Sequence, residues 1–482
     1  MLGSIDWLVL GLYLAVVLAM GFYARKGQES TRDYLLAGGT MPWWAVGISL
    51  IATSVSTTSM VGTPAESFSG DLRYLCLNLP VPLSILLVTV LFIPWFRRQG
   101  VASAYEALQR RFNRRVRLLA ASLYSLHVLL RTGVLVYGPA LVLAEVTGLS
   151  LWVTIVLVGL SAVVYSAVGG LKAVIWTDVL QFAVLFGGAV ITCLVIEARV
   201  DGGLFGILAL AREAGKTRVL DTSFSLSDSR NLWAAGVAYL ALDLAIRATD
   251  QQFVQRYLSV SSVARAQGAA LLAALLGFAV SMLFFLLGLH LWAFYQQFPP
   301  ATPFADPNSV LPAFVTTHLH GGLAGVLVAG IFAAAMSSID SAIAALSSTI
   351  TLDFFGNRRR DDKSLLAIAR TSLVVFGLLS LGFAFFAATF TQSLLNTALS
   401  FTSLFTGSLL GIFTLAILPV RLKPDAVLLG GLLGAASLWV VTSLSPGDVA
   451  WPYLPVISFT ATVAWSLGLS ALPLPGVKAN TR

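Results

Sequence analysis

The sequence predicts an all-α, multi-pass membrane protein, and three observations support this fold class. The 482 residues are 57% hydrophobic and only 11% charged, whereas soluble globular domains carry about 25% charged residues. Apolar runs of about 20 residues, the length of a membrane-spanning helix, recur along the whole chain. The basic residues concentrate in alternate loops, as they do on the cytoplasmic side of membrane proteins.

The apolar runs predict thirteen spanning helices. In chain order they lie near residues 5–24, 43–68, 74–96, 118–144, 150–168, 174–197, 233–255, 267–295, 321–352, 364–388, 394–419, 425–444 and 453–473. If the N-terminus starts outside, the inward loops hold most of the 30 Lys and Arg residues, Arg256 among them. This bias places the N-terminus outside and the C-terminus inside.

The first apolar segment has the character of a retained helix rather than a signal peptide. It has no basic residues before it and no small-residue cleavage site after it. The charge pattern and length suggest a bacterial inner membrane as the location of this multi-pass protein.

The composition also excludes several functions. The net charge of +8 follows the loop pattern, so it indicates contact with a lipid bilayer and no nucleic-acid partner. No Ser-His-Asp order, HExxH motif or phosphate-binding glycine loop is present, so we expect no enzyme. The four histidines are scattered at His127, His290, His318 and His320. No obligate protein partner is evident.

A serine-rich stretch at residues 331–355 is the most informative feature of the chain. Ser337 and Ser341 are four residues apart and share one helical face, with Ser338 and Asp340 on its flanks. Polar groups at bilayer depth are costly and usually functional. Because hard cations are coordinated by oxygen atoms, this column predicts a sodium-binding helix. The alternative is that small serines only allow close helix packing.

Two segments have the pattern of broken membrane helices. Residues 43–68 begin apolar and continue with a run of Ser and Thr that includes Gly62 and Pro64. Such an interruption is typical of discontinuous helices that offer backbone carbonyls to ions. A corresponding break is expected at 243–252, although that stretch lacks Gly and Pro.

Five motifs then resemble those of a known family. They are WWAVGISLIATSVS (43–56), SAYEALQRRFNRR (103–115), GGLKAVIWTDVLQF (169–182), DQQFVQRYLSV (250–260) and FAAAMSSIDS (332–341). In this order they resemble the sodium:solute symporter family, which contains the sodium–galactose, sodium–proline and sodium–sialic acid symporters. The resemblance covers residues 5 to 475.

The resemblance implies a LeuT-like core of two inverted five-helix repeats. The expected organisation is an extra helix and inner loop, a first repeat, an outer loop, a second repeat, and two C-terminal helices with a tail. These parts correspond to residues 1–42, 43–198, 199–232, 233–420 and 421–482.

The resemblance also implies a principal sodium site, built from carbonyls of a broken helix and from the serine-rich helix. The matching positions are the carbonyls of Ala52, Val55 and Ala334 and the hydroxyls of Ser337 and Ser338.

Some members bind a second sodium through positions that match Asp178, Ser337, Asp340 and Ser341. This chain departs from them at Asp340, where those members carry a hydroxyl residue. Two carboxylates in one site repel unless a cation lies between them or one is protonated. The sequence therefore predicts a second sodium site, or a proton in place of that sodium. The alternative is that Asp178 caps or pairs at the inner end of its helix.

For the solute, the matching positions are Ser54, Ser56, Thr58, Ser59, Asn78 and Arg131. The planar guanidinium of Arg131 suits a carboxylate, which points to a carboxylated sugar such as sialic acid, or to another small organic acid.

Asp243 and Arg247, one helical turn apart, are also expected near the solute. If they pair with each other, Arg131 stays free for the solute. If Asp243 pairs with Arg131, a neutral sugar or polyol is favoured and Arg131 is structural.

The predicted function is sodium-coupled symport by alternating access. A passive channel or uniporter would not need the sodium ligands. A membrane sensor would need a signalling domain, and none is evident after residue 475.

Overall fold

The computed structural model describes residues 2–300, 302–356, 360–388, 394–445 and 447–472, and within these ranges every regular element is helical. The first half contains α1 (Ser4–Ala24), α2 (Thr31–Leu36), α3 (Trp43–Ser54), α4 (Thr57–Ser69), α5 (Val81–Leu87), α6 (Ile93–Gln99), α7 (Ala104–Arg111), α8 (Arg114–Thr147), α9 (Leu151–Glu197) and α10 (Gly203–Glu213).

The second half contains α11 (Tyr239–Thr249), α12 (Gln251–Leu258), α13 (Val263–Gln297), α14 (Val310–His318), α15 (Leu323–Thr349), α16 (Asp362–Ala387), α17 (Leu394–Ile417), α18 (Pro424–Leu444) and α19 (Leu454–Ala471). Shorter helical turns at Ala37–Gly39, Arg73–Asn78, Val88–Phe92, Leu232–Ala238, Pro307–Ser309, Ile350–Phe354 and Trp451–Tyr453 join or extend them.

Ten helices within the described ranges are long and apolar enough to cross a membrane. Two predicted spans, 150–168 and 174–197, fall on the single helix α9, which bends at Gly170 with φ 57° and ψ −158°. The predicted span 43–68 is divided between α3 and α4, each too short to cross alone. The multi-pass architecture is thus present, and the count of thirteen crossings remains a prediction.

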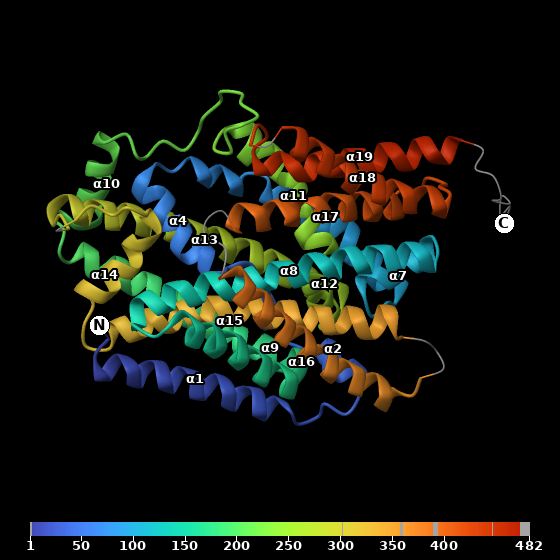
Figure 1. Cartoon of the computed structure of the whole chain (residues 1–482), viewed down its shortest axis with the longest axis horizontal. Helices are drawn as coiled ribbons and strands as arrows, with labels where there is room; N and C mark the ends of the chain where they lie inside the picture. The colour runs from blue at the N-terminus through green and yellow to red at the C-terminus, as the bar shows by residue number, and fades with distance from the viewer. Residues whose placement is uncertain (1, 301, 357–359, 389–393, 446, 473–482) are drawn as a thin grey trace.

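The helices run mostly along the long axis of the molecule, and different helices lie at its two ends (Figure 1). Helices α1, α10 and α14 are at the left end, where α1 begins, whereas α7 and the end of α19 are at the right. The first helix begins at one end of the molecule and the last helix ends at the other, as a chain with an odd number of crossings requires.

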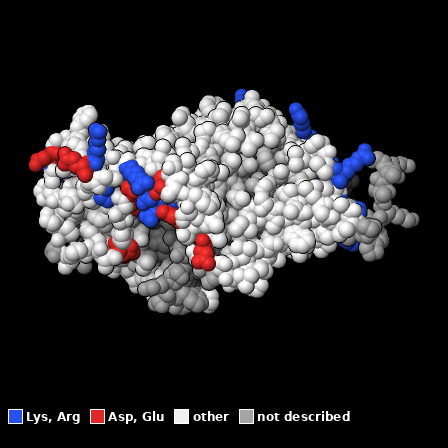
Figure 2. Space-filling model, turned by 90° about the horizontal axis from the view of Figure 1, so that it is seen from above, with Lys and Arg blue, Asp and Glu red and all other residues white. Residues whose placement is uncertain are grey.

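The surface charge follows the same axis. In Figure 2 most of this face is uncharged; its left half carries both acidic and basic side chains, whereas the right end carries basic side chains and no acidic ones. An uncharged middle zone is expected of a surface that faces lipid. The basic right end corresponds to the expected cytoplasmic side.

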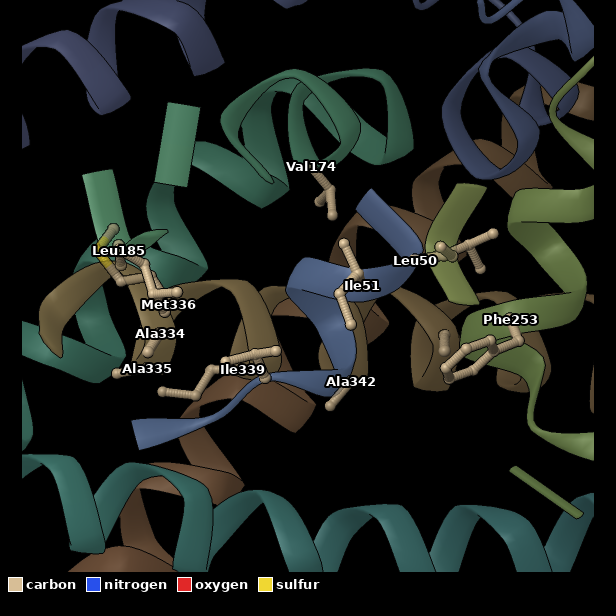
Figure 3. Packing of buried hydrophobic residues seen from close by; sticks show 14 of the residues in the cluster. Leu50, Ile51, Val174, Leu185, Phe253, Ala334, Ala335, Met336, Ile339 and Ala342 are labelled. Atoms are coloured by element: carbon tan, nitrogen blue, oxygen red, sulfur yellow. The ribbon is translucent and has the colours of Figure 1, made fainter. Parts of the chain in front are cut away.

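Helix α15 forms the centre of the protein. Every residue from Leu327 to Thr349 is buried, and the helix packs against α1, α8, α9 and α16. Its small residues allow this close approach. Figure 3 shows Ala334, Ala335, Met336, Ile339 and Ala342 of α15 among Leu50 and Ile51 of α3, Val174 and Leu185 of α9, and Phe253 of α12. The polar groups of α15 therefore lie away from both lipid and water.

Candidate functional site

A break in the backbone separates α3 from α4. Helix α3 ends at Ser54, and Val55 (φ −91°, ψ 105°) and Ser56 (φ −98°, ψ 170°) are extended before α4 begins at Thr57. The predicted discontinuous helix is confirmed. The break lies before Gly62 and Pro64, which are both inside α4.

The tertiary contact with α15 accounts for this position of the break. The Thr57 hydroxyl donates a hydrogen bond to the Ile331 carbonyl at 3.1 Å, which ties the start of α4 to α15. A break of this kind leaves carbonyls at the end of α3 without their usual helical partners.

The hydroxyls of α15 meet those carbonyls. Ser337 Oγ lies 3.0 Å from the Ala52 carbonyl oxygen and 3.3 Å from that of Ala334. Ser338 Oγ lies 3.5 Å from the Val55 carbonyl oxygen. The structure thus brings together all five residues predicted for the principal sodium site. They supply uncharged oxygen atoms only, a donor set that suits a hard cation.

The residues predicted for a second cation form a neighbouring cluster. The Asp340 carboxylate accepts hydrogen bonds from the Tyr165 hydroxyl and from Ser341 Oγ, the latter at 3.1 Å. Asp178 Oδ2 accepts a hydrogen bond from Ser49 Oγ at 2.5 Å. Ser337, the fourth predicted member, bonds instead to the carbonyl oxygens of the first cluster.

Arg256 corrects the sequence-based assignment of the basic residues. Its inclusion among the inward loops is wrong, because the side chain is 0% exposed. Its Nη2 atom lies 3.0 Å from Asp178 Oδ2 and 2.5 Å from Ser341 Oγ, and its Nε lies 2.6 Å from Ser49 Oγ. Helix α12 directs this side chain into the protein interior, where its guanidinium lies between α9 and α15.

The ion pair with Arg256 is the pairing considered as the alternative role of Asp178. It does not use the whole carboxylate, since Asp178 Oδ1 is buried and has no hydrogen-bond partner among the described residues. Buried polar atoms without partners are rare. This oxygen is therefore available to a bound cation.

A second break separates α11 from α12 at Asp250, which is extended (φ −73°, ψ 126°). The expected break within 243–252 is therefore confirmed without Gly or Pro. Asp250 Oδ1 accepts hydrogen bonds from the Gln252 backbone N–H and from the Tyr124 hydroxyl, both at 2.8 Å. An aspartate in this position caps the new helix and satisfies one of its free N–H groups.

A cavity of about 800 Å³ lies beside the two breaks. All the residues predicted to contact solute line it: Ser54, Ser56, Thr58, Ser59, Asn78, Arg131, Asp243 and Arg247. The lining continues along α4 to Glu66 and Ser69 and reaches Pro307, near α14. The cavity thus extends toward the left end of Figure 1, the expected outer side.

The charges of the cavity are arranged as the carboxylate prediction requires. Asp243 Oδ2 pairs with Arg247 Nε at 2.8 Å. Arg131 forms no hydrogen bond and no ion pair within 4 Å among the residues described; Asp250 interacts with it only electrostatically. Of the two arrangements considered from the sequence, the structure has the one that leaves Arg131 free.

Among the cavity residues that sequence reasoning missed are Tyr124, His127 and Asp250. The first two share a face of α8 with Arg131, at the i, i+3, i+7 spacing of neighbours on a helix. That spacing was available in the sequence as a signal. Asp250 was visible only as part of a motif.

Comparison with known proteins decides the family, because the model of the "Sodium:solute symporter family" matches residues 34–434. The chain belongs to the sodium:solute symporter family. It is 32% identical over 445 residues to the sodium/sialic acid symporter NanT of Aliivibrio fischeri, covering 91% of this chain and 88% of that protein. It is also 32% identical over 462 residues to human sodium-coupled monocarboxylate transporter 1, covering 93% of this chain and 74% of the human protein.

Solved structures agree with the family assignment. A substrate-bound, outward-open Na⁺-coupled sialic acid symporter superposes with a TM-score of 0.90 and 29% identity, covering 97% of this chain and 98% of that one. The nucleobase-cation-symport-1 transporter Mhp1 has a TM-score of 0.60 and 14% identity, covering 92% and 96%; this likeness concerns the fold alone. The symporter therefore has the LeuT-like fold implied by the sequence motifs. Its division into repeats at 43–198 and 233–420 remains a prediction.

Proposed function

We propose that this symporter imports a small organic acid together with sodium, and that the solute is a carboxylated sugar such as sialic acid. The observation that carries the proposal is the free guanidinium of Arg131 in the cavity, next to an Asp243–Arg247 pair that is already neutralised. A free, partly desolvated arginine binds a carboxylate through two parallel hydrogen bonds.

The hydroxyl-bearing side chains of the first break suit the rest of a sugar acid. Ser54, Ser56, Thr58 and Ser59 flank the first break and line the cavity. Hydroxyls both donate and accept hydrogen bonds, as sugar hydroxyls do. The names of the relatives point the same way, since sialic acids and monocarboxylates both carry a carboxylate.

Sodium acts in this proposal as the co-transported substrate. The carbonyls of Ala52, Val55 and Ala334 and the hydroxyls of Ser337 and Ser338 hold the principal ion, which then joins the first break to α15. Coupling requires that ion and solute favour the same conformation, because a ligand shifts only the equilibrium between states that it binds differently. Each sodium that enters gains about 2.3 kcal/mol per 100 mV of membrane potential.

A second sodium is proposed at Asp178, Asp340 and Ser341, with Ser337 at its edge. Arg256 and the two carboxylates are all fully buried. With both carboxylates ionised this group carries one excess negative charge, which a bound sodium neutralises. The Asp178 oxygen that lacks a partner supports such a ligand.

Asparagine at position 178 or 340 tests this second site. The number of sodium ions transported per solute is expected to fall from two to one in both variants. Wild-type sodium affinity and coupling in both would contradict the second site. One sodium accompanied by proton uptake in the wild type would assign the site to a proton.

We also propose that the protein lies in the cell's inner membrane with its N-terminus outside. The right end of the face in Figure 2, where basic side chains occur without acidic ones, supports this orientation. A C-terminal fusion to a reporter that works only in the cytoplasm is expected to be active. Activity of a C-terminal fusion to a reporter that works only outside the cytoplasm would reverse the assignment.

Thermal stability of the purified protein tests the solute, measured with sugars, sugar acids and monocarboxylates in sodium or in potassium. A ligand that binds the native state raises its stability. Stabilisation by an acid in sodium only, lost in Arg131→Ala, is the expected result. Stabilisation by neutral sugars that persists in Arg131→Ala would make Arg131 structural, and equal shifts in potassium would contradict sodium coupling.

A further inference from the structure

Helix α8 presents three polar side chains to the cavity, Tyr124, His127 and Arg131. Two of them have an evident role, because Tyr124 supports the second break through Asp250 and Arg131 is the proposed carboxylate anchor. His127, one turn from Arg131, is neither a partner in the break nor part of an ion pair.

The imidazole of His127 is buried and lacks partners. Its residue is only 6% exposed, and its Nδ1 atom is buried with no hydrogen-bond partner among the described residues. Buried polar groups in folded proteins are nearly always hydrogen-bonded. Nδ1 is enclosed by protein, so the nitrogen that a ligand in the cavity can reach is Nε2, which also has no hydrogen-bond partner among the described residues.

We propose that His127 determines solute specificity by hydrogen-bonding a hydroxyl group of the acid whose carboxylate Arg131 holds. This inference rests on the proposed function and specifies its substrate class as hydroxylated acids. In a neutral imidazole Nε2 either donates or accepts a hydrogen bond, and a hydroxyl group matches either role.

The spacing on α8 makes His127 and Arg131 neighbours on one face of the helix. Residues four apart on a helix have Cβ atoms about 5–6 Å from each other. A six-membered sugar-acid ring spans a distance of this order, so its carboxylate can reach Arg131 while a ring hydroxyl reaches His127. A simple apolar acid would fill the same space and leave His127 without a partner.

The test compares two acids that share a six-membered ring and a carboxylate. D-Glucuronate carries ring hydroxyls, whereas cyclohexanecarboxylate carries none. Their affinities are measured in sodium, from protein stability as a function of acid concentration, for the wild type and for His127→Phe and His127→Asn. The wild type is expected to prefer glucuronate.

His127→Phe is expected to reduce the preference for glucuronate by about tenfold, the effect of one lost hydrogen bond. Binding of cyclohexanecarboxylate should be little changed. His127→Asn keeps a donor and an acceptor and should retain part of the preference. Leu135→Ala, which alters an apolar residue of the same cavity wall, is the matched control and should change both affinities alike.

The outcomes separate this proposal from the one on which it rests. If His127→Phe weakens both acids equally, or neither, His127 does not determine specificity. If the wild type binds no acid in sodium, the proposed function itself fails. Sodium-induced stabilisation without solute reports whether each variant is folded, and His127→Asn provides the answer if His127→Phe is not.

Discussion

The two helix breaks differ in how the free backbone groups at the broken helix ends find partners. At the first, Val55 and Ser56 are extended, and Ser56 makes no capping bond to the helix that follows. At the second, the Asp250 side chain caps α12 and is itself held by Tyr124. The first break leaves carbonyl oxygens facing the hydroxyls of α15, whereas at the second break Asp250 and the Asp243–Arg247 pair have partners within the protein.

This difference indicates which break can bind an ion. A cation needs several oxygen atoms directed at one place, and the first break supplies backbone carbonyls opposite the hydroxyls of Ser337 and Ser338. The second break instead positions side chains: Asp243 and Arg247 before it, Arg256 after it. We infer that the first break binds sodium and that the second shapes the solute cavity and the central ion pair.

The largest expected effect comes from removing the buried charge that follows the second break. Arg256→Met leaves Asp178 buried without its cationic partner and should lower the free energy of unfolding by about 3–5 kcal/mol. Unfolding of the purified protein in detergent measures it. The double variant Arg256→Met with Asp178→Leu should regain part of that loss, because Asp178 is then no longer a buried charge without its partner, whereas Asp340 keeps its hydrogen bonds from Tyr165 and Ser341. An unchanged stability of the single variant would show that the pair is not buried as described.

The next largest effect is expected at the first break, where a substitution should change the affinity for sodium. Ser338→Ala removes one hydroxyl ligand and should raise the half-saturating sodium concentration by about 10- to 100-fold, as for a lost bond to a charged group. Stability without sodium should change little. Ser347→Ala is the matched control, because Ser347 lies on the same helix as Ser338 but its hydroxyl bonds to the Ala369 carbonyl of α16 rather than to a carbonyl of the first break. Equal sodium dependence in the two variants would remove Ser338 from the site.

A smaller effect is expected from the cap of the second break. Asp250→Ala should lower stability by about 1 kcal/mol, the usual effect of losing an N-cap. Asp250→Asn keeps an acceptor and should lose less. Tyr124→Phe tests the support of the cap by the same unfolding measurement. If Asp250→Asn is as damaging as Asp250→Ala, the charge of Asp250 is more important than its capping bond.

The smallest effect should lie outside both breaks, in the loop that contains Asp221. Asp221 accepts hydrogen bonds from the Ser223 hydroxyl and backbone N–H and pairs with Arg73, and these contacts lower its pKa to about 2. The unfolded value is about 3.9, so the stabilisation is complete above that pH and is lost as the pH falls toward 2. Asp221→Asn should therefore be slightly less stable than the wild type at pH 7, and the difference should narrow below pH 4. A constant difference would exclude ionisation of Asp221 as its cause.

The site was predictable from the sequence where its chemistry is local. Ser337 and Ser338 occupy one stretch of an apolar helix, and their hydroxyls do face the carbonyls of Ala52 and Val55. The pairing of Asp243 with Arg247 was likewise expressed in their spacing, since residues four apart on a helix are neighbours.

The prediction failed where the relevant partner is remote in sequence. Arg256 follows a polar stretch and was placed in a loop, yet it lies fully buried against Asp178 and Ser341. His127 was dismissed as one of several scattered histidines, and only the cavity reveals that it lacks a partner. Neither relation has a periodicity that could be read along the chain.

The sequence by itself determined that this protein spans the membrane, that α15 carries its polar centre, and that α3 and α4 form a broken helix. These properties depend on hydropathy and on residue types within a single segment. Only the tertiary structure decided which charges meet, which are neutralised and which remain free for a ligand. The reason is that electrostatic interactions act through space. Arg256, Asp178 and Ser341 come from three helices, and only the packing of these helices places the guanidinium of Arg256 against Asp178 and Ser341.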